Sequence, residues 1–280
     1  MRLVRFGERG AERPGLVDDN GLVRDLSAHV ADIAGDTLSD AGIARIRALD
    51  IALLPVVDKP RFGACVSGVE KFICIGLNYA DPARETGAQI PPEPIILFKA
   101  TSTLMGPNDT IEIPRNSTKT DWEVELGVVI GKHCKYVDTA DALSHVAGYF
   151  VVNDLSERDF QHNRQGQWVK GKSADTFGPI GPWLVPRDEI DDPQNLAMWL
   201  DVNGERLQSS STSNMVYTVA FLVSYLSQFM SLHPGDIIST GTPNGVGMGL
   251  SPPRYLRAGD IVSLGIQALG EQRQAVRNAD

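Results

Sequence analysis

The segment TDWEVELGVVIGK, at residues 120–132, constrains the fold of this chain more than any other stretch. Apolar and acidic residues alternate from Trp122 to Leu126, which predicts a β-strand with one apolar face. The residues that follow, LGVVIG, are apolar on both faces, so we expect the strand to lie in the centre of a sheet. The alternation places Glu123 and Glu125 on the other face, roughly 6.6–7 Å apart. Like charges so placed repel, and these carboxylates therefore require an explanation.

Short strands dominate the chain from residue 71 onward, and helices are few. Besides the segment above, the strand pattern occurs in KFICIGL, PIILFKA, AGYFVVND, LAMWLDV, DIIST and DIVSLGI, and VNGE (202–205) predicts a hairpin turn. Helical spacing is confined to residues 80–87, 139–145 and 215–230. The pattern predicts an α+β chain that is mostly β, without the regular strand–helix alternation of a nucleotide-binding sheet.

The N-terminal region has its own short strands and one helix. DDNG, at residues 18–21, predicts a hairpin turn, and residues 38–50 predict a helix whose N-cap is Ser39 or Asp40. LPVVDKPRFG, at residues 54–63, is expected to break regular structure and to act as a linker.

The size and charge of the chain limit its organisation and its partners. Its 280 residues, 42% of them apolar, allow either one large domain or a large domain with a small companion. We predict a small N-terminal domain over 1–68 and a larger one over 69–280. The net charge of −9 argues against nucleic acid and an anionic membrane surface as partners. The N-terminus is too charged for a signal peptide, and the most apolar window is too short to span a bilayer. Three widely spaced cysteines form no disulfide framework, which suits a reducing cytoplasm.

Two glutamates on a strand commonly form no more than a solvated face, and that interpretation stays open here. Three features favour a site instead: the strand is expected to be central, no cysteine–histidine cluster competes as a metal site, and a second apolar strand ends at Asn153-Asp154. Glu123, Glu125 and a third carboxylate from this neighbouring strand would supply half of an oxygen octahedron. Hard oxygen ligands suit Mg²⁺ or Mn²⁺, or else Ca²⁺, and not Zn²⁺.

Two other segments carry weaker signals. STGTPNGVGMG (239–249) lacks the lysine of a phosphate-binding loop, so it predicts either a tight loop whose N–H groups hold a small anion or a simple turn. WVKGKS (168–173) carries two lysines that are either solvated on a loop or the fixed cations that an acidic protein needs to handle an acidic substrate.

Five motifs in consistent order resemble the fumarylacetoacetate hydrolase family: FICIGLNYADPARE, DWEVELGVVIGK, NDLSERDFQ, KGKSADTFGPIGPW and DIISTGTPNGVG. The resemblance covers about residues 71–268, and the N-terminal region is similar to the variable front domain of bacterial members. Within the family the chain is most similar to bacterial enzymes of the 2,4-diketo-3-deoxy-L-rhamnonate hydrolase type, many of which are named ureidoglycolate lyase. The resemblance implies a β-roll fold, a homodimer, and Mg²⁺ or Mn²⁺ as the cofactor.

The resemblance also implies roles for individual side chains. The metal ligands would be Glu123, Glu125 and Asp154. Lys172 would lie beside the metal and act in catalysis. The substrate contacts would be Arg158, Gln161, Lys172 and Thr242.

One motif departs from the family pattern N-Y-x-D-H-x-x-E, in which the histidine and the glutamate activate water. Here the segment is NYADPARE, so Glu85 is present while Pro82 replaces the histidine, and proline neither accepts nor donates a proton. Glu85 would then be the catalytic base, alone or through a neighbour. His162, which follows Gln161, is one candidate neighbour; the alternative is that it is an exposed loop residue.

The implied reaction is the cleavage of the C3–C4 bond of a 2,4-diketo acid by water. An example is the conversion of 2,4-diketo-3-deoxy-L-rhamnonate to pyruvate and lactate in sugar-acid catabolism. Two other functions stay open: oxaloacetate decarboxylation or keto–enol tautomerisation, which need no water, and metal binding without catalysis. The missing histidine favours the reactions without water, whereas similarity along the whole chain favours the hydrolase.

Overall fold

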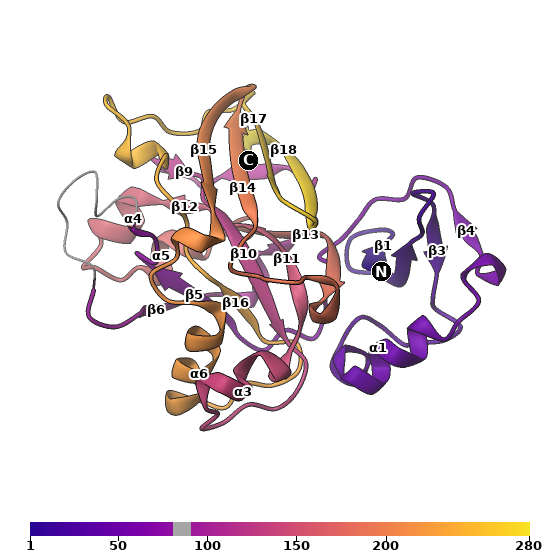
Figure 1. Cartoon of the computed structure of the whole chain (residues 1–280). Coiled ribbons are helices and arrows are strands. Elements are labelled where there is room, and N and C mark those ends of the chain that lie inside the picture. Colours follow the sequence, from indigo (N-terminus) through magenta and orange to yellow (C-terminus); the bar gives the residue numbers. More distant parts are fainter. Residues whose placement is uncertain (81–90) are drawn as a thin grey trace.

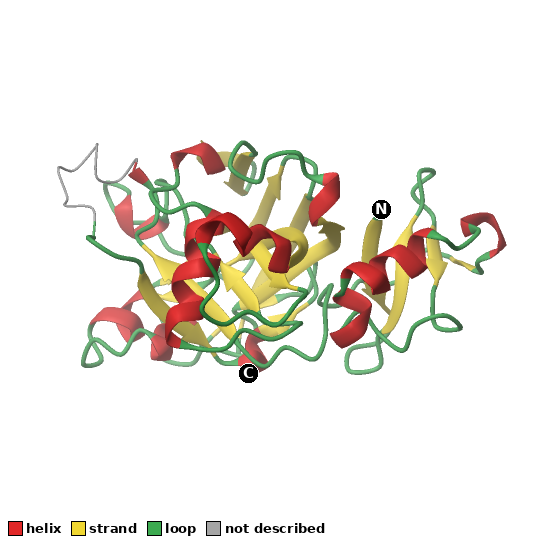
Figure 2. Ribbon diagram, turned by 60° about the horizontal axis from the view of Figure 1, so that its bottom comes forward, coloured by secondary structure: helices red, strands yellow, loops and turns green. Residues whose placement is uncertain are grey.

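The fold is α+β and mostly β, as predicted. The computed structural model describes residues 1–80 and 91–280 of the chain. An N-terminal group of strands and one helix lies at one end of the molecule, and helices lie along the outside of the strands of the larger part (Figure 1, Figure 2). In the described residues, no helix is long and apolar enough to cross a membrane.

The N-terminal strands form an antiparallel array: β1 (Arg2–Phe6), β2 (Arg13–Val17), β3 (Val23–Asp25) and β4 (Val56–Val57). The predicted turn at 18–21 joins β2 to β3. The predicted helix is α1 (Asp40–Arg47), and its N-cap is Ser39, whose hydroxyl accepts a hydrogen bond from the Gly42 N–H at 3.0 Å. The expectation of an irregular linker over 54–63 is wrong in part, because the β-branched pair of β4 adds to the exposed edge of β3.

A long sheet runs through both parts of the chain in the order β4-β3-β2-β1-β13-β11-β10-β16-β5-β6. Its remaining strands are β5 (Phe72–Gly76), β6 (Ile95–Lys99), β10 (Val124–Ile130), β11 (Val146–Asn153), β13 (Gly178–Pro186) and β16 (Ile237–Ser239), and β7 (Leu104–Met105) pairs with β13. The strand β10 lies between β11 and β16, and all its residues are buried. The prediction of a central strand is therefore confirmed.

A second sheet packs against one face of the first. Its strands, in the order β15-β14-β17-β18-β8, are β15 (Glu205–Ser211), β14 (Ala197–Val202), β17 (Ile261–Ile266), β18 (Gly270–Asn278) and β8 (Ile111–Ile113). The predicted hairpin at 202–205 joins β14 to β15. Val124 and Leu126 of β10 share one buried cluster with Leu200 and Leu264 of the second sheet. The apolar face predicted for β10 thus packs in the core between the sheets, and its carboxylates lie on the opposite face.

Helices and short elements complete the described structure. The helices of the larger part are α3 (Thr139–Ala142), α4 (Arg158–His162), α5 (Val169–Lys172) and α6 (Val219–Phe229). A two-stranded pair consists of β9 (Thr120–Asp121) and β12 (Ser156–Glu157). Single turns of 3-10 helix span Gly35–Leu38, Ile51–Leu53, Thr101–Thr103, Leu143–His145, Arg187–Glu189, Thr212–Asn214 and Gly247–Gly249.

The helix predictions hold in part. The helix expected over 139–145 is confirmed as α3 and the 3-10 turn that continues it. The helix expected over 215–230 begins later, at Val219, because the Thr218 hydroxyl caps it by accepting from the Phe221 N–H at 3.2 Å. Residues 81–87 of the third predicted helix lie outside the described part of the chain.

Candidate metal centre

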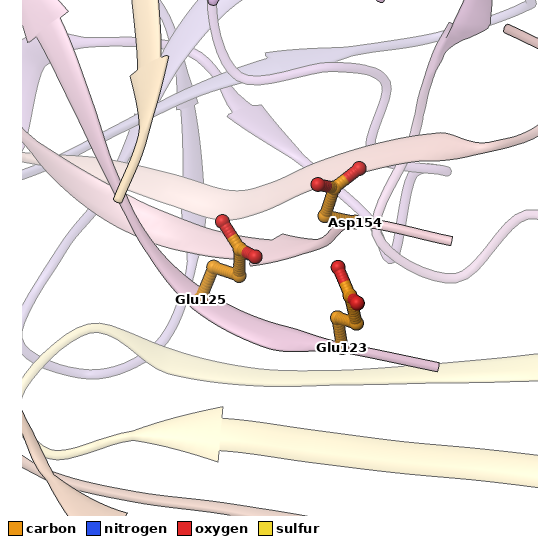
Figure 3. A group of neighbouring side chains, drawn as sticks. All are labelled: Glu123, Glu125 and Asp154. Carbon is orange, nitrogen blue, oxygen red and sulfur yellow. The ribbon is translucent and has the colours of Figure 1, made fainter. Parts of the chain in front are cut away.

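Three buried carboxylates meet where β10 and β11 pair. Glu123 directly precedes β10, Glu125 is its second residue, and Asp154 directly follows β11. Because Val124 pairs with Asn153, the three side chains lie at the same end of neighbouring strands, and Figure 3 shows them close to one another. One carboxylate oxygen of each lies within 4.8 Å of the others.

Burial decides between the two interpretations of the glutamates. Glu123 is 7% exposed, Glu125 1% and Asp154 1%. A solvated face is therefore the wrong interpretation. Buried carboxylates are costly unless charge or hydrogen bonds compensate them, so their partners identify the chemistry of the site.

Two buried lysines contact these carboxylates. Lys172, at the end of α5, donates to Glu123 Oε2 at 2.6 Å and to Asp154 Oδ2 at 2.7 Å. Lys99, at the end of β6, forms an ion pair with Asp154 Oδ1 and donates to the Leu155 carbonyl at 2.9 Å. The structure thus places Lys172 beside the predicted ligands. The interpretation of residues 168–173 as a solvated loop is wrong for Lys172, because this lysine ends the helix α5 and its side chain is buried.

Arg158 and Gln161, on one face of α4, also lie at the carboxylates. Arg158 donates from Nη2 to Glu123 Oε1 at 2.7 Å, from Nε to Asp121 Oδ2 at 2.8 Å, and from Nη1 to Gln161 Oε1 at 3.0 Å. Asp121 also accepts from the backbone N–H groups of Gly247 and Met248, at 2.6 and 2.9 Å. The described contacts of Arg158 are thus with the protein, and its role as a substrate contact stays a prediction, as does that of Gln161.

Glu125 is held by the strand and loop that follow α6. Its Oε2 accepts from the Ser239 hydroxyl at 2.6 Å and from the Gly241 N–H at 2.9 Å. A side chain at Gly241 would not fit, because φ is +97° and a Cβ would lie 2.8 Å from the Cβ of Asn78. The tight-loop interpretation of 239–249 therefore agrees with the structure, although the anion held there is the glutamate of the protein.

Thr242 lies next to this contact, but its hydroxyl already has partners. The Oγ1 atom donates to the Val124 carbonyl at 2.9 Å and accepts from the Gln208 amide at 2.8 Å. Thr242 therefore fastens its loop to the start of β10. Its predicted contact with substrate stays a prediction.

Burial and neighbouring charges shift the pKa values in opposite directions. Burial raises the pKa of Glu125 well above its usual range, and the charges of Asp154 and Glu123 raise it further. Burial also raises the pKa of Asp154, but Lys172 and Lys99 outweigh that effect and lower it to about 2. Burial lowers the pKa of Lys172, but the negative charges of Asp154 and Glu123 raise it by more. The pKa of Lys172 therefore lies above its usual range, and its ammonium group stays charged.

The donor set fits a hard divalent cation. The converging atoms are all carboxylate oxygens, which hard divalent cations prefer. The pKa of Glu125 is raised by burial and by the neighbouring negative charges, and a bound cation would offset that repulsion. Such a buried triad could bind a divalent metal.

Sequence reasoning missed the contact of Lys99 with Asp154 and that of Ser239 with Glu125. In the structure Leu97 and Lys99 lie on the buried side of β6, while the larger apolar Phe98 between them is 39% exposed. A buried lysine requires a buried anion, but the sequence of the strand does not show which of its faces is buried. Ser239 ends an apolar strand and carried no signal either.

Three predicted roles cannot be placed in the site. Glu85 and Pro82 lie outside the described residues. His162, at the end of α4, is exposed and contacts Trp168 edge to face, with 5.7 Å between ring centroids. Its role as a neighbour of the base stays a prediction.

The buried triad could hold a divalent metal, and comparisons with known proteins identify the family to which this fold belongs. Residues 71–277 match the family described as Fumarylacetoacetate (FAA) hydrolase C-terminal. The chain belongs to the fumarylacetoacetate hydrolase family, whose members include hydrolases and isomerases.

Relatives resemble the chain over its whole length. A protein of Burkholderia ambifaria, named provisionally as a hydrolase, is 62% identical, with 100% of each chain covered. The structure of a fumarylacetoacetate hydrolase from Exiguobacterium antarcticum is similar to this one, with a TM-score of 0.86 and 33% sequence identity. The structure of maleylpyruvate hydrolase from Sphingobium sp. SYK-6, in complex with manganese(II) and pyruvate, is similar with a TM-score of 0.83 and 28% sequence identity. Both structural matches cover 100% of each chain, so the fold of the family is confirmed for the whole chain.

Proposed function

We propose that this protein is a metal-dependent hydrolase that cleaves the C–C bond of a 2,4-diketo acid. A substrate such as 2,4-diketo-3-deoxy-L-rhamnonate would yield pyruvate and lactate in sugar-acid catabolism. The observation that carries the proposal is the buried triad with Lys172 bonded to two of its members. The Sphingobium relative supports it, because that enzyme is a hydrolase in complex with manganese and pyruvate.

The metal in this proposal is Mg²⁺ or Mn²⁺, held by Glu123, Glu125 and Asp154. When bound, it would act as a Lewis acid toward the carboxylate and 2-oxo oxygens of the substrate. Lys172 contacts Glu123 and Asp154, so its ammonium lies where it can stabilise the negative charge that develops on those substrate oxygens. Water, losing a proton to the base, would add to the C4 carbonyl, and the C3–C4 bond would break with its electron pair on C3. The resulting pyruvate enolate would take up a proton at C3 to give pyruvate.

The remaining roles follow from the family motifs. Glu85 is proposed to accept the proton of the attacking water, alone or with His162. Arg158, Gln161 and Thr242 are proposed to bind the substrate. We also propose a homodimer in the cytoplasm, with a small 2-oxo or 2,4-diketo acid as the partner.

The metal assignment is tested by removing one ligand. Asp154→Asn should weaken Mn²⁺ binding at least about tenfold in isothermal titration calorimetry, because the site loses a charged ligand. Asp159→Asn is the matched control, since the Asp159 carboxylate bonds only Asn163 and Arg164 among the described contacts. EDTA should abolish pyruvate release from a 2,4-diketo acid, and added Mg²⁺ or Mn²⁺ should restore it. Unchanged affinity in Asp154→Asn would contradict the proposal.

One observation favours a second candidate function. In the sequence Pro82 occupies the position at which the family motif has the histidine that helps to activate water. A reaction that does not consume water would not need that histidine, so its rate would not depend on the replacement. Oxaloacetate decarboxylation and keto–enol tautomerisation are such reactions. Turnover of oxaloacetate and of a 2,4-diketo acid, compared with the same metal, separates the two functions, and turnover of neither would favour a metal-binding protein without catalysis.

A further inference from the structure

Two histidines outside the metal centre face each other beyond the far end of β10. His133 lies three residues after the last residue of that strand, and His233 lies between α6 and β16. Their rings meet edge to face, with 5.3 Å between the ring centroids and 75° between the ring planes. Both side chains are exposed, so a ligand can reach both rings from solvent.

The backbone places the two histidines opposite each other. Their neighbours Cys134 and Leu232 form an antiparallel bridge, in which each N–H donates to the carbonyl of the other residue at 2.9 Å. In an antiparallel pair, the position next to such a hydrogen-bonded pair brings two residues together with Cα atoms about 4.5 Å apart and with their side chains on the same face. His133 and His233 occupy that position.

Further hydrogen bonds fix the backbone at both histidines. Asp236 accepts from the His233 N–H through Oδ2 at 2.7 Å, and its own N–H donates to the His233 carbonyl at 2.9 Å. The His133 carbonyl accepts from Nδ1 of His145 at 2.9 Å, since a carbonyl oxygen can only accept. The two imidazole rings thus project from a fixed backbone, and rotation about their own side-chain bonds is enough to adjust them to a ligand.

We propose that His133 and His233 together bind one transition-metal ion of the kind that imidazole prefers, namely Zn²⁺, Ni²⁺ or Cu²⁺. Imidazole nitrogen suits these ions, whereas Mg²⁺ and Mn²⁺ prefer oxygen ligands. In the described part of the chain only the triad brings three metal-binding groups together, so water would complete the coordination of an ion held by the histidine pair. Cu²⁺ should bind most tightly, because its complexes with nitrogen ligands are the most stable of the three.

This site is separate from the carboxylate triad. The seven residues of β10, about 23 Å of strand, lie between Glu123 and the segment that carries His133. The two sites also use different ligand atoms, nitrogen at one and oxygen at the other. The inference therefore does not rest on the proposed function, and the loss of either site should leave the other in place.

The test is a titration of the full chain with Cu²⁺ in the presence of excess Mg²⁺, followed by calorimetry and by electron paramagnetic resonance. At the proposed site the spectrum of bound Cu²⁺ should show splitting from two nitrogen ligands. His133→Ala and His233→Ala should each weaken binding at this site at least about tenfold and leave one nitrogen ligand. His29→Ala is the matched control, because His29 is also exposed and no ring contact of it is found in the described part of the chain.

The two single variants keep the test decisive, since each removes one exposed ring and either of them alone can contradict the proposal. A histidine variant with the Cu²⁺ affinity and spectrum of the unmodified protein would overturn the inference, as would a spectrum of the unmodified protein without two nitrogen ligands. Asp154→Asn should leave the two-nitrogen spectrum unchanged. A failure of the carboxylate metal centre and a failure of the histidine site are therefore distinguishable.

Discussion

At the residue scale, Lys172 stands out because its ammonium bonds two of the three carboxylates of the triad. Its partners there are Glu123 Oε2 and Asp154 Oδ2. The lysine thus lies beside the proposed metal ligands without being one of them, and the other oxygens of these carboxylates bond Arg158 and Lys99. A substitution of Lys172 can therefore test catalysis separately from metal binding.

Lys172→Met should abolish turnover while Mn²⁺ still binds. All three carboxylates remain, but the negative charge on the substrate loses its fixed cation, and removing one such donor typically costs about 10²–10³ in kcat. Steady-state kinetics and calorimetry on the same preparation test both halves of the prediction. Lys170→Met is the control, because Lys170 lies one residue before Gly171 on the same helix but is exposed. Normal turnover in Lys172→Met would mean that the substrate does not lie beside this lysine.

Pro82 carries the second prediction at this scale. Glu85 lacks the histidine with which the family's glutamate activates water, and a positioned general base contributes typically about 10²–10⁴-fold. Pro82→His should therefore raise hydrolysis of a 2,4-diketo acid by roughly tenfold or more, and Glu85→Gln should abolish it.

The same two variants discriminate between the candidate reactions. If Pro82→His leaves hydrolysis unchanged or lowers it, another group activates water or the natural reaction needs none. In the latter case oxaloacetate turnover should already be high in the unmodified protein.

At the element scale, the site depends on how closely the single turn of α5 approaches α4. Gly171 makes that approach possible, because a Cβ there would lie 2.6 Å from the Gln161 Cβ and 2.6 Å from the Glu157 carbonyl oxygen. Lys172 is the next residue, so its position follows from the packing of a glycine that is itself neither a predicted metal ligand nor a predicted substrate contact.

Gly171→Ala should reduce turnover and stability together. The added methyl group forces α5 away from α4, with a cost of about 1–3 kcal/mol in the free energy of unfolding, and it moves Lys172 away from the carboxylates. Gly249→Ala is the matched control, since the nearest atom to a Cβ there lies at 3.7 Å. Thermal unfolding and kinetics measure the two effects, and an alanine variant with normal values of both would show that α5 tolerates displacement.

The elements of the site differ in how well sequence predicts them. The strands β10 and β11 follow from long apolar runs, so the convergence of Glu123 and Asp154 was open to prediction. The turn of α5 was not, because four residues with a central glycine carry no helical period. The Lys99 contact joins the end of β6 to Asp154, which follows β11, and these two strands do not pair in the sheet. A contact between segments so far apart has no local signature in the sequence.

At the scale of the whole molecule, the N-terminal part and the larger part share a core. Leu16 and Leu26 belong to the same buried cluster as Val129 and Phe150, which lie on the β10 and β11 face opposite the second sheet. The backbones also approach closely, since a Cβ on Gly131 would lie 2.6 Å from the Leu38 carbonyl oxygen. The strand β1 continues the long sheet through its pairing with β13. The predicted boundary at residue 68 therefore separates two parts of the sequence that are packed together in the fold.

This packing predicts that residues 69–280 do not fold stably alone. Without the N-terminal part, apolar side chains of the sheet would be exposed, among them Phe72, Val129, Phe150 and Leu184. Each contributes about 1.5–3 kcal/mol by burial, so exposing these four costs about 6–12 kcal/mol, close to the whole stability of a typical domain. The truncated chain should precipitate on expression, or unfold at least about 10 °C below the full chain in a thermal scan.

The metal gives an independent measure of the same dependence. The face lost to solvent includes Val129, which lies on the strand that carries Glu125, so loss of packing there should loosen the triad. Calorimetry on any soluble 69–280 should therefore show weaker Mn²⁺ binding than in the full chain. A truncated chain with the melting temperature and metal affinity of the full protein would instead establish 69–280 as an autonomous domain, because neither quantity survives the exposure of a shared core.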